Sequence, residues 1–178
     1  AIQKSLPIMQ LCTPASERKF NGGKLVNRYD MARFIVGLMD RWDLKPKVVL
    51  DPKLLQDVPE SHPDYEAVQM AVSTGILLGF DGKFHGDKLV NRYQMSVILN
   101  RLFEKNGIPS PSPVSEHTFK DVDPTHWAYT AVQDMVSRGI LQGFDGKFHG
   151  DKLVNRYQMA VIIRKVLQQS PLKQRAKI

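Results

Sequence analysis

The sequence predicts an all-α protein of three helix–loop–helix repeats. The residues Gly79 to Met95 read GFDGKFHGDKLVNRYQM, and the same letters return from Gly143 to Met159. A shorter copy, FNGGKLVNRYDM, begins at Phe20, so the copies recur with a period of 64 residues. After each copy, apolar residues follow at helical spacing. We call the three copies (20–31, 79–95 and 143–159) the constant block. Repeats of this kind stack to share one core, here a pseudo-threefold bundle.

Long helices are predicted near residues 28–40, 92–104 and 156–168. Asn155 is a strong N-cap, and Gln158 three positions later resembles a capping box. Each helix carries an apolar stripe that should be buried: Met31, Phe34, Ile35, Leu38 and Met39; Met95, Ile98, Leu99, Leu102 and Phe103; Met159, Ile162, Ile163, Val166 and Leu167.

Shorter helices are predicted in front of the second and third blocks. One runs from about Tyr65 to Thr74, and the other should be capped by Asp123 or Thr125 and stopped at Gly139. The first repeat is cut short, and Pro7 would fall in mid-helix, which argues against a helix over the first ten residues.

The repeats divide the chain into 1–45, 46–110 and 111–170, followed by a basic tail at 171–178. The linkers contain KPKVVLDPK and the Pro/Ser-rich NGIPSPSPVSEH. Neither is long enough to indicate independent domains.

Composition narrows the function. The net charge of +7 suits an anionic partner, but the basic residues form no stripe with aromatics, so nucleic acid is not expected. No apolar run reaches the ~20 residues of a membrane span. The single Cys12 allows no internal disulfide and has no Cys–His arrangement around it. No acid/base carboxylate pair is recognisable, so neither an enzyme nor a cofactor is predicted.

Sequence identity between the second and third repeats is complete within the block but low in the residues that follow it. Between 96–104 and 160–168 only two positions match, whereas the block keeps every letter. Because cores accept many apolar exchanges, we interpret the block as a surface presented three times to a ligand or partner. A tight turn that requires these letters is the alternative.

Three segments carry a family resemblance: FKDVDPTHWAYTAV (119–132), GILQGFDGKF (139–148) and the Asn-Arg pair that opens each long helix. They resemble the S-layer homology domain. That resemblance implies a pseudo-threefold bundle in the bacterial cell envelope, exported to the cell surface or periplasm, which holds proteins on an anionic wall polysaccharide. It also implies ligand grooves between repeats, where an Arg of a Thr-Arg-Ala-Glu motif meets a pyruvylated sugar. By position this Arg is Arg28, Arg92 and Arg156.

The sequence departs from that pattern. Thr-Arg-Ala-Glu becomes Asn-Arg-Tyr-Asp or Asn-Arg-Tyr-Gln, the usual Pro after the loop Phe becomes Gly86 and Gly150, and Pro63 stands in the place of Trp127. The candidate ligand-binding residues are Arg28, Arg92, Arg156, Asn27, Asn91, Asn155, Lys24, Lys88, Lys152, Asp57, Asp121, Trp127, Gly79 and Gly143.

An Arg in the first turn of a helix lies at the positive end of the dipole, which costs ~0.3–1 kcal/mol. A bound anion would reverse that sign, because free backbone N–H groups and the guanidinium would converge on it. The lysines four residues earlier could add charge. The alternative is a salt bridge to Asp81, Asp145 or Asp121.

Other patterns are weaker. FDGKFHGDK lacks the spacing of a calcium loop, and the replacement of His85 and His149 by Asn21 argues against a threefold metal site. His62 and His126 belong to helix entry. Tyr29, Tyr93 and Tyr157 pack between repeats or stack on a sugar. Two functions remain: an anchor that binds an acidic wall polymer, or a structural subunit that docks another protein in an envelope assembly.

Overall fold

The computed structural model describes residues 19–44, 55–111 and 118–169. Within these residues the regular elements are five helices: α1 Arg28–Arg41, α2 Tyr65–Ser73, α3 Arg92–Lys105, α4 Tyr129–Ser137 and α5 Arg156–Gln168. The described part contains isolated β-bridges but no strand, which confirms the all-α class. Pro7, Cys12, the basic tail, most of the first linker and residues 112–117 of the second lie outside the described residues, and the repeat boundaries stay predictions.

The long helices begin where the sequence predicts. Each of α1, α3 and α5 starts after an Asn that caps it, and in each the residue three positions later completes a capping box. The partners are Asp30 in the first repeat and Gln94 and Gln158 in the others. The capping pattern is therefore confirmed in all three repeats.

The cap predicted for α4 is wrong. Its N-cap is Ala128, which makes no side-chain capping bond. Asp123 instead accepts hydrogen bonds from the backbone N–H of Thr125, at 2.8 Å, and from its hydroxyl, at 2.6 Å. The carboxylate therefore closes a turn ahead of the helix. The predicted stop is confirmed, since the helix ends at Ser137 and Gly139 follows with φ of 68°.

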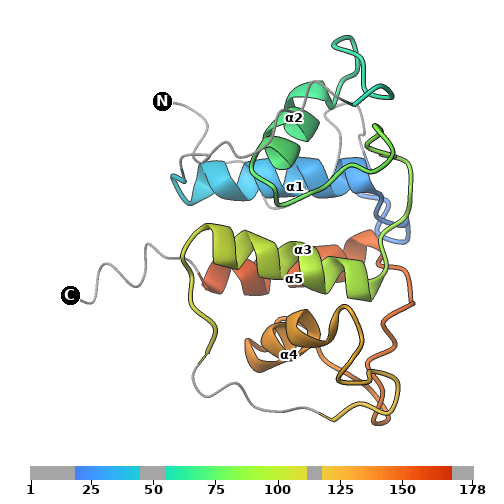
Figure 1. Ribbon diagram of the computed structural model, residues 1–178, viewed down its shortest axis with the longest axis vertical. Coiled ribbons are helices and arrows are strands. Elements are labelled where there is room, and N and C mark those ends of the chain that lie inside the picture. Colours follow the sequence, from blue (N-terminus) through green and yellow to red (C-terminus); the bar gives the residue numbers. More distant parts are fainter. Residues whose placement is uncertain (1–18, 45–54, 112–117, 170–178) are drawn as a thin grey trace, which may run out of the picture.

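A ring of backbone hydrogen bonds joins the three blocks. The N–H of Val26 donates to the carbonyl of Val154 at 2.8 Å, that of Val90 to Val26 at 2.9 Å, and that of Val154 to Val90 at 3.0 Å. Each valine is 1% exposed. Figure 1 shows α1, α3 and α5 running in the same direction, with their N-terminal ends at the right, where the block loops gather. The ring gives the bundle its pseudo-threefold centre.

The repeats also interlock through their front helices. α2 belongs to the second repeat in sequence but packs on α1, and α4 of the third repeat packs on α3 (Figure 1). The predicted stripes meet in one shared core, where Met31, Met95 and Met159 are at most 1% exposed and Ile35, Leu99 and Ile163 are fully buried. A single repeat is therefore not a packing unit.

The fold explains several invariant letters of the block. Asp81 and Gly82 both have positive φ, of 51° and 68°, between the bridged residues Phe80 and Lys83. This is the two-residue Asp-Gly turn favoured in hairpins, and it recurs in the third repeat at 145–146. The tight-turn alternative therefore accounts for part of the block.

Two departures from the family pattern are one structural exchange. A Cβ added to Gly86 would lie 2.0 Å from the ring of Tyr29, and one added to Gly150 would lie 2.1 Å from the ring of Tyr93. Each tyrosine N–H also donates to the carbonyl of the glycine that its ring covers. The tyrosines therefore pack between repeats, and the glycines leave room for them.

This packing predicts that an added methyl group destabilises the protein at Gly86 but not at a glycine with open space around it. Gly86→Ala should lower the free energy of unfolding by ~1–3 kcal/mol, because the methyl overpacks the joint beneath Tyr29. Gly23→Ala is the matched control, since nothing lies within 4 Å of its added Cβ. Urea denaturation followed by circular dichroism measures both. Equal effects of the two substitutions would contradict the close packing at this joint.

Candidate functional site

All three repeats contribute to one surface groove of about 390 Å³. Arg28 comes from the first repeat and Trp127 from the third, while the loop before the Asp-Gly turn of the second repeat and one face of α3 form the rest. The lining residues are Arg28, Leu77, Leu78, Gly79, Phe80, Gln94, Val97, Ile98, Arg101 and Trp127.

Arg28 is held in this groove by the backbone of the second repeat. Its Nε donates to the carbonyl of Phe84 at 2.9 Å and its Nη2 to the carbonyl of Leu78 at 2.5 Å. The guanidinium carbon lies 4.7 Å from the centroid of the Phe84 ring. Arg92 repeats these contacts on the third repeat, with the carbonyls of Phe148 at 3.1 Å and Gln142 at 2.6 Å.

These two arginines lack a carboxylate at ion-pair distance among the described residues. Burial lowers the pKa of Arg28, and the negative charge of Asp57 partly offsets this effect. Burial lowers the pKa of Arg92 in the same way, with Asp121 as the opposing charge. Both guanidinium groups are therefore partly desolvated cations, and no carboxylate of the described residues pairs with them directly.

The helix N-termini do not supply free donors, so that part of the sequence interpretation is wrong. The N–H of Arg28 donates to the carbonyl of Lys88 at 3.1 Å, and that of Tyr29 to Gly86 at 3.1 Å. The N–H of Asp30 donates to its cap, Asn27. The backbone N–H groups of Arg92 and Arg156 donate in the same way to the carbonyls of Lys152 and Lys24, respectively. Contacts with the neighbouring repeat and with the Asn cap use these N–H groups, so they are not available to a ligand.

Asp57 and Asp121 clamp the block loops. The carboxylate of Asp57 accepts from the backbone N–H groups of Phe84, at 2.6 Å, and His85, at 2.7 Å. Asp121 holds the third loop in the same way. Burial alone would raise the pKa of both carboxyls, but the backbone N–H donors lower it, and the net pKa lies below its usual value. Neither residue lines the groove.

Of the remaining candidates, some line the groove and the others are exposed or have structural roles. Lys24, Lys88 and Lys152 are exposed, and Nζ of Lys88 lies 4.5 Å from the centroid of the Phe80 ring. Asn27, Asn91 and Asn155 are helix caps. An added Cβ at Gly79 would lie 2.8 Å from a backbone carbonyl oxygen, and one at Gly143 would lie 2.7 Å from the equivalent oxygen. The structure thus brings Arg28, Gly79 and Trp127 together in the groove.

Sequence reasoning missed Phe80, Gln94 and Arg101 as groove residues. A signal for Phe80 was present, because it recurs as Phe144 in the third repeat yet belongs to no apolar stripe. It is 44% exposed, and its counterpart Phe144 is 71% exposed. Trp127 is 64% exposed, with its ring edge against Tyr93 at 6.1 Å.

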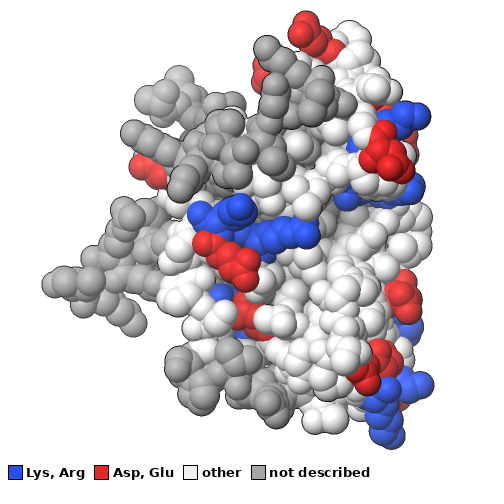
Figure 2. Space-filling view, in the orientation of Figure 1, with Lys and Arg blue, Asp and Glu red and all other residues white. Residues whose placement is uncertain are grey.

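The surface shows mixed charge. In Figure 2, basic and acidic side chains lie side by side along the right-hand edge, over the block loops. On this face the described residues form no continuous basic stripe. The described part also contains no group of His, Cys, Asp or Glu arranged to hold a metal ion, and none of its helices is long and apolar enough to cross a membrane.

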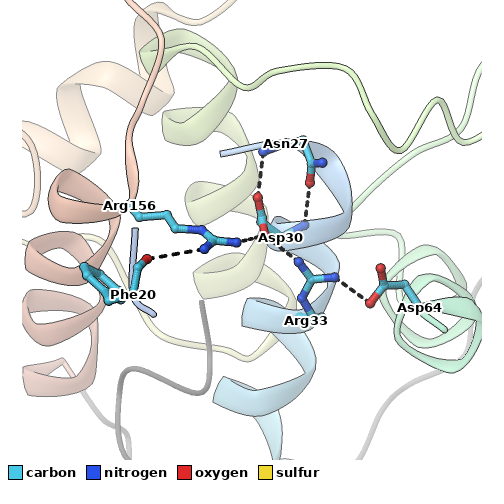
Figure 3. Close-up of polar contacts among 6 residues, drawn as sticks. All are labelled: Phe20, Asn27, Asp30, Arg33, Asp64 and Arg156. Carbon is cyan, nitrogen blue, oxygen red and sulfur yellow. Dashed lines mark hydrogen bonds and ion pairs between the residues drawn. The ribbon is translucent and has the colours of Figure 1, made fainter. Parts of the chain in front are cut away.

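Arg156 has a different environment from the other two arginines. Its side chain is fully buried, and its Nη2 lies 3.6 Å from Oδ1 of Asp30. Its Nη1 donates to the carbonyl of Phe20 at 3.3 Å. Figure 3 shows Arg156 reaching from α5 toward Asp30 on α1, where Arg33 links Asp30 to Asp64. The salt-bridge alternative is realised here, with Asp30 as the acid in place of the aspartates named from the sequence.

Comparison with known proteins finds similarity in the second and third repeats. The family model described as S-layer homology domain matches residues 56–96 and 118–160. The chain is 46% identical over 52 residues to outer membrane protein SlpA of Thermus thermophilus, which covers 29% of this chain and 6% of that protein. It is 32% identical over 87 residues to cell surface glycoprotein 1 of Acetivibrio thermocellus, covering 47% and 4% respectively. It is also 29% identical over 90 residues to a cellulosome-anchoring protein of that organism, covering 49% and 20%.

The two clamping aspartates predict a loss of stability in acid. Their folded pKa values lie below the ordinary 3.8, so the unfolded chain binds more protons at low pH. The stability they contribute is complete above pH 3.8 and is lost as the pH falls through the lowered folded values. Asp57→Asn and Asp121→Asn should flatten this part of the profile, measured by denaturation at a series of pH values. Asp145→Asn, on an exposed turn, is the control. An unchanged acid profile in both clamp variants would contradict the assignment.

Proposed function

Residues 56–96 and 118–160 are S-layer homology domains, and we propose that this chain is a non-catalytic anchoring module that binds an acidic cell-wall polysaccharide in grooves between its repeats. Relatives of the chain are named as outer membrane, cell surface and anchoring proteins. The chain is a protein of the bacterial cell envelope. It spans only 6% and 4% of the first two of these relatives.

The observation that supports this proposal is Arg28 in its groove. A guanidinium that is partly desolvated and lacks a carboxylate is suited to an incoming acidic group, because charge-assisted bonds to carboxylates are stronger than neutral ones. Its Nε and Nη2 already hold backbone carbonyls, which fixes the plane of the group. The remaining Nη1 is the donor for the ligand acid.

The walls of the groove suit a sugar ring. Phe80 and Trp127 present exposed aromatic surface in the groove that contains Arg28, and Gln94 and Arg101 add polar groups. Ligand sites generally combine aromatic walls with a few polar groups that fix orientation. A sugar that carries a pyruvate ketal would place its carboxylate at Arg28 and its ring against the aromatic side chains.

The backbone contacts of Arg28 recur at Arg92, and the groove positions other than Trp127 have counterparts one period further along the chain. These counterparts are Leu141, Gln142, Gly143, Phe144, Gln158, Val161, Ile162 and Lys165. Arg92 contacts the carbonyl of Gln142 as Arg28 contacts that of Leu78. We therefore assign a second acidic-sugar groove to the joint between the second and third repeats. Two linked grooves on a repeating polymer would bind more tightly than either alone.

The competing function is docking of another envelope protein. Exposed apolar side chains on the third repeat favour it: Phe144 is 71% exposed, Tyr157 63% and Val161 55%. Of these, Phe144 and Val161 also belong to the proposed second groove. The polysaccharide function ranks first because it also accounts for the uncompensated arginine charge.

The anchoring function predicts a loss of binding when the groove arginines are removed. Arg28→Ala and Arg92→Ala should each weaken binding to an acidic wall polymer by about 10- to 150-fold, since a hydrogen bond to a charged group contributes ~1.5–3 kcal/mol. Sedimentation with purified sacculi, before and after removal of the secondary polymers, measures the effect.

Arg164→Ala is the control, because Arg164 is an exposed arginine of α5 outside the groove lining. Circular dichroism shows whether each variant is folded. If folded Arg28→Ala and Arg92→Ala proteins bind sacculi as well as the parent, the polysaccharide proposal fails. Protein docking would then take first place.

A further inference from the structure

One position in the block differs between repeats in a way that changes its surroundings. The third residue of each long helix is Asp30 in the first repeat, and Gln94 and Gln158 in the others. Both glutamines are exposed, whereas Asp30 is 2% exposed. Gln94 lines the groove that contains Arg28. By the same repeat geometry, Asp30 faces the arginine of the third repeat, Arg156.

Asp30 is fully satisfied as a buried carboxylate. Its Oδ2 accepts from the backbone N–H of Asn27 at 3.0 Å, and its Oδ1 contacts both Arg33 and Arg156 (Figure 3). Arg33 in turn contacts Asp64 at 2.6 Å. This chain of charges links α5 to α1 and α2, and so connects all three repeats.

The residues of this network change together along the sequence. The first repeat has Asp30 and Arg33, and Asp64 precedes α2; one period later the chain has Gln94, Val97 and Ala128 at these positions. Gln94 and Val97 both line the groove beside Arg28. Equivalent positions in the repeats therefore hold an acidic network in one case and the side chains of an open groove in the other.

Electrostatics explains why the same arginine cannot have both an internal carboxylate partner and a bound acidic ligand. A buried cation needs a counter-charge, and removing one partner of a buried pair is strongly destabilising. At Arg28 the protein leaves that counter-charge to a ligand. At Arg156, Asp30 already supplies it in a side-chain environment that is 0% and 3% exposed for the two residues. A ligand carboxylate would have to displace Asp30 and leave a second negative charge buried.

We propose that Asp30 takes the place of the ligand's acidic group at Arg156, so that this chain offers two acidic-sugar sites and keeps its third joint closed by an internal ion network. The inference rests on the proposed function at Arg28 and Arg92. It makes Asp30 a residue that determines how many sites are open, and it assigns Arg156 to structure and not to ligand binding.

Site-resolved NMR of the arginine Nε–H groups tests this proposal. The probe is a hexose methyl glycoside that carries one pyruvate ketal, and the same glycoside without the ketal is the control. In the parent protein, the Arg28 and Arg92 signals should shift in proportion to occupancy, while the Arg156 signal stays in place. A shift of Arg156 in the parent protein, at the concentrations that shift the other two, overturns the proposal.

Asp30→Gln gives the complementary result. Glutamine can still complete the capping box, as Gln94 does, and Arg156 should then shift with the acidic glycoside. A second variant, Asp30→Gln with Arg33→Val and Asp64→Ala, carries the residues of the next repeat at all three network positions. If either variant folds and binds the probe at Arg28 and Arg92 but not at Arg156, the proposal is overturned. If neither folds, the parent measurement decides.

The proposed function fails separately. If neither Arg28 nor Arg92 shifts in the parent protein, the acidic-sugar sites are wrong. The internal ion network is then tested by a double-mutant cycle on thermal stability with Asp30→Gln and Arg156→Gln. Strong non-additivity supports the network, and additive losses overturn it.

Discussion

The structure depends on a closed ring of backbone hydrogen bonds among Val26, Val90 and Val154. Each bond contributes only ~0.5–1.5 kcal/mol net, but a buried N–H left without a partner costs ~1–3 kcal/mol. In a ring, every repeat supplies an acceptor to one neighbour and takes one from the other. If one repeat detaches, a backbone N–H in one neighbour and a carbonyl in the other lose their hydrogen-bond partners. The ring also fixes the start of each long helix, and so places an arginine at every joint.

That constraint bears on the proposed binding of an acidic ligand. In many proteins a helix N-terminus binds anions through its free N–H groups. Here those groups hold the next repeat, at Lys88 and Gly86 for α1. The charge that remains for a ligand lies on the guanidinium of Arg28, which backbone carbonyls hold in place. Structure and binding therefore use different parts of the same residue, its N–H and its side chain.

Local features were readable from the sequence, whereas contacts across the period were not. Helical spacing and the Asn caps predicted α1, α3 and α5 because both signals lie within a few residues. The start of α4 was missed, since a turn closed by Asp123 has the same residue types as a helix cap. The three Asn-Arg-Tyr copies predicted equal arginines. Only the fold showed that Asp30 gives Arg156 a partner, although its difference from Gln94 and Gln158 was visible in the letters.

The identity of the constant block has two physical causes. Turn geometry, capping and close glycine packing account for letters such as Asp81, Gly82, Gly86 and Asn91. They do not account for Phe80, whose side chain is 44% exposed. A repeated residue that neither fills the core nor determines the backbone conformation is best explained by contact with a ligand or partner at the surface. Phe80 lines the groove beside Arg28, so the part of the block that folding leaves unexplained coincides with the proposed acidic-sugar groove.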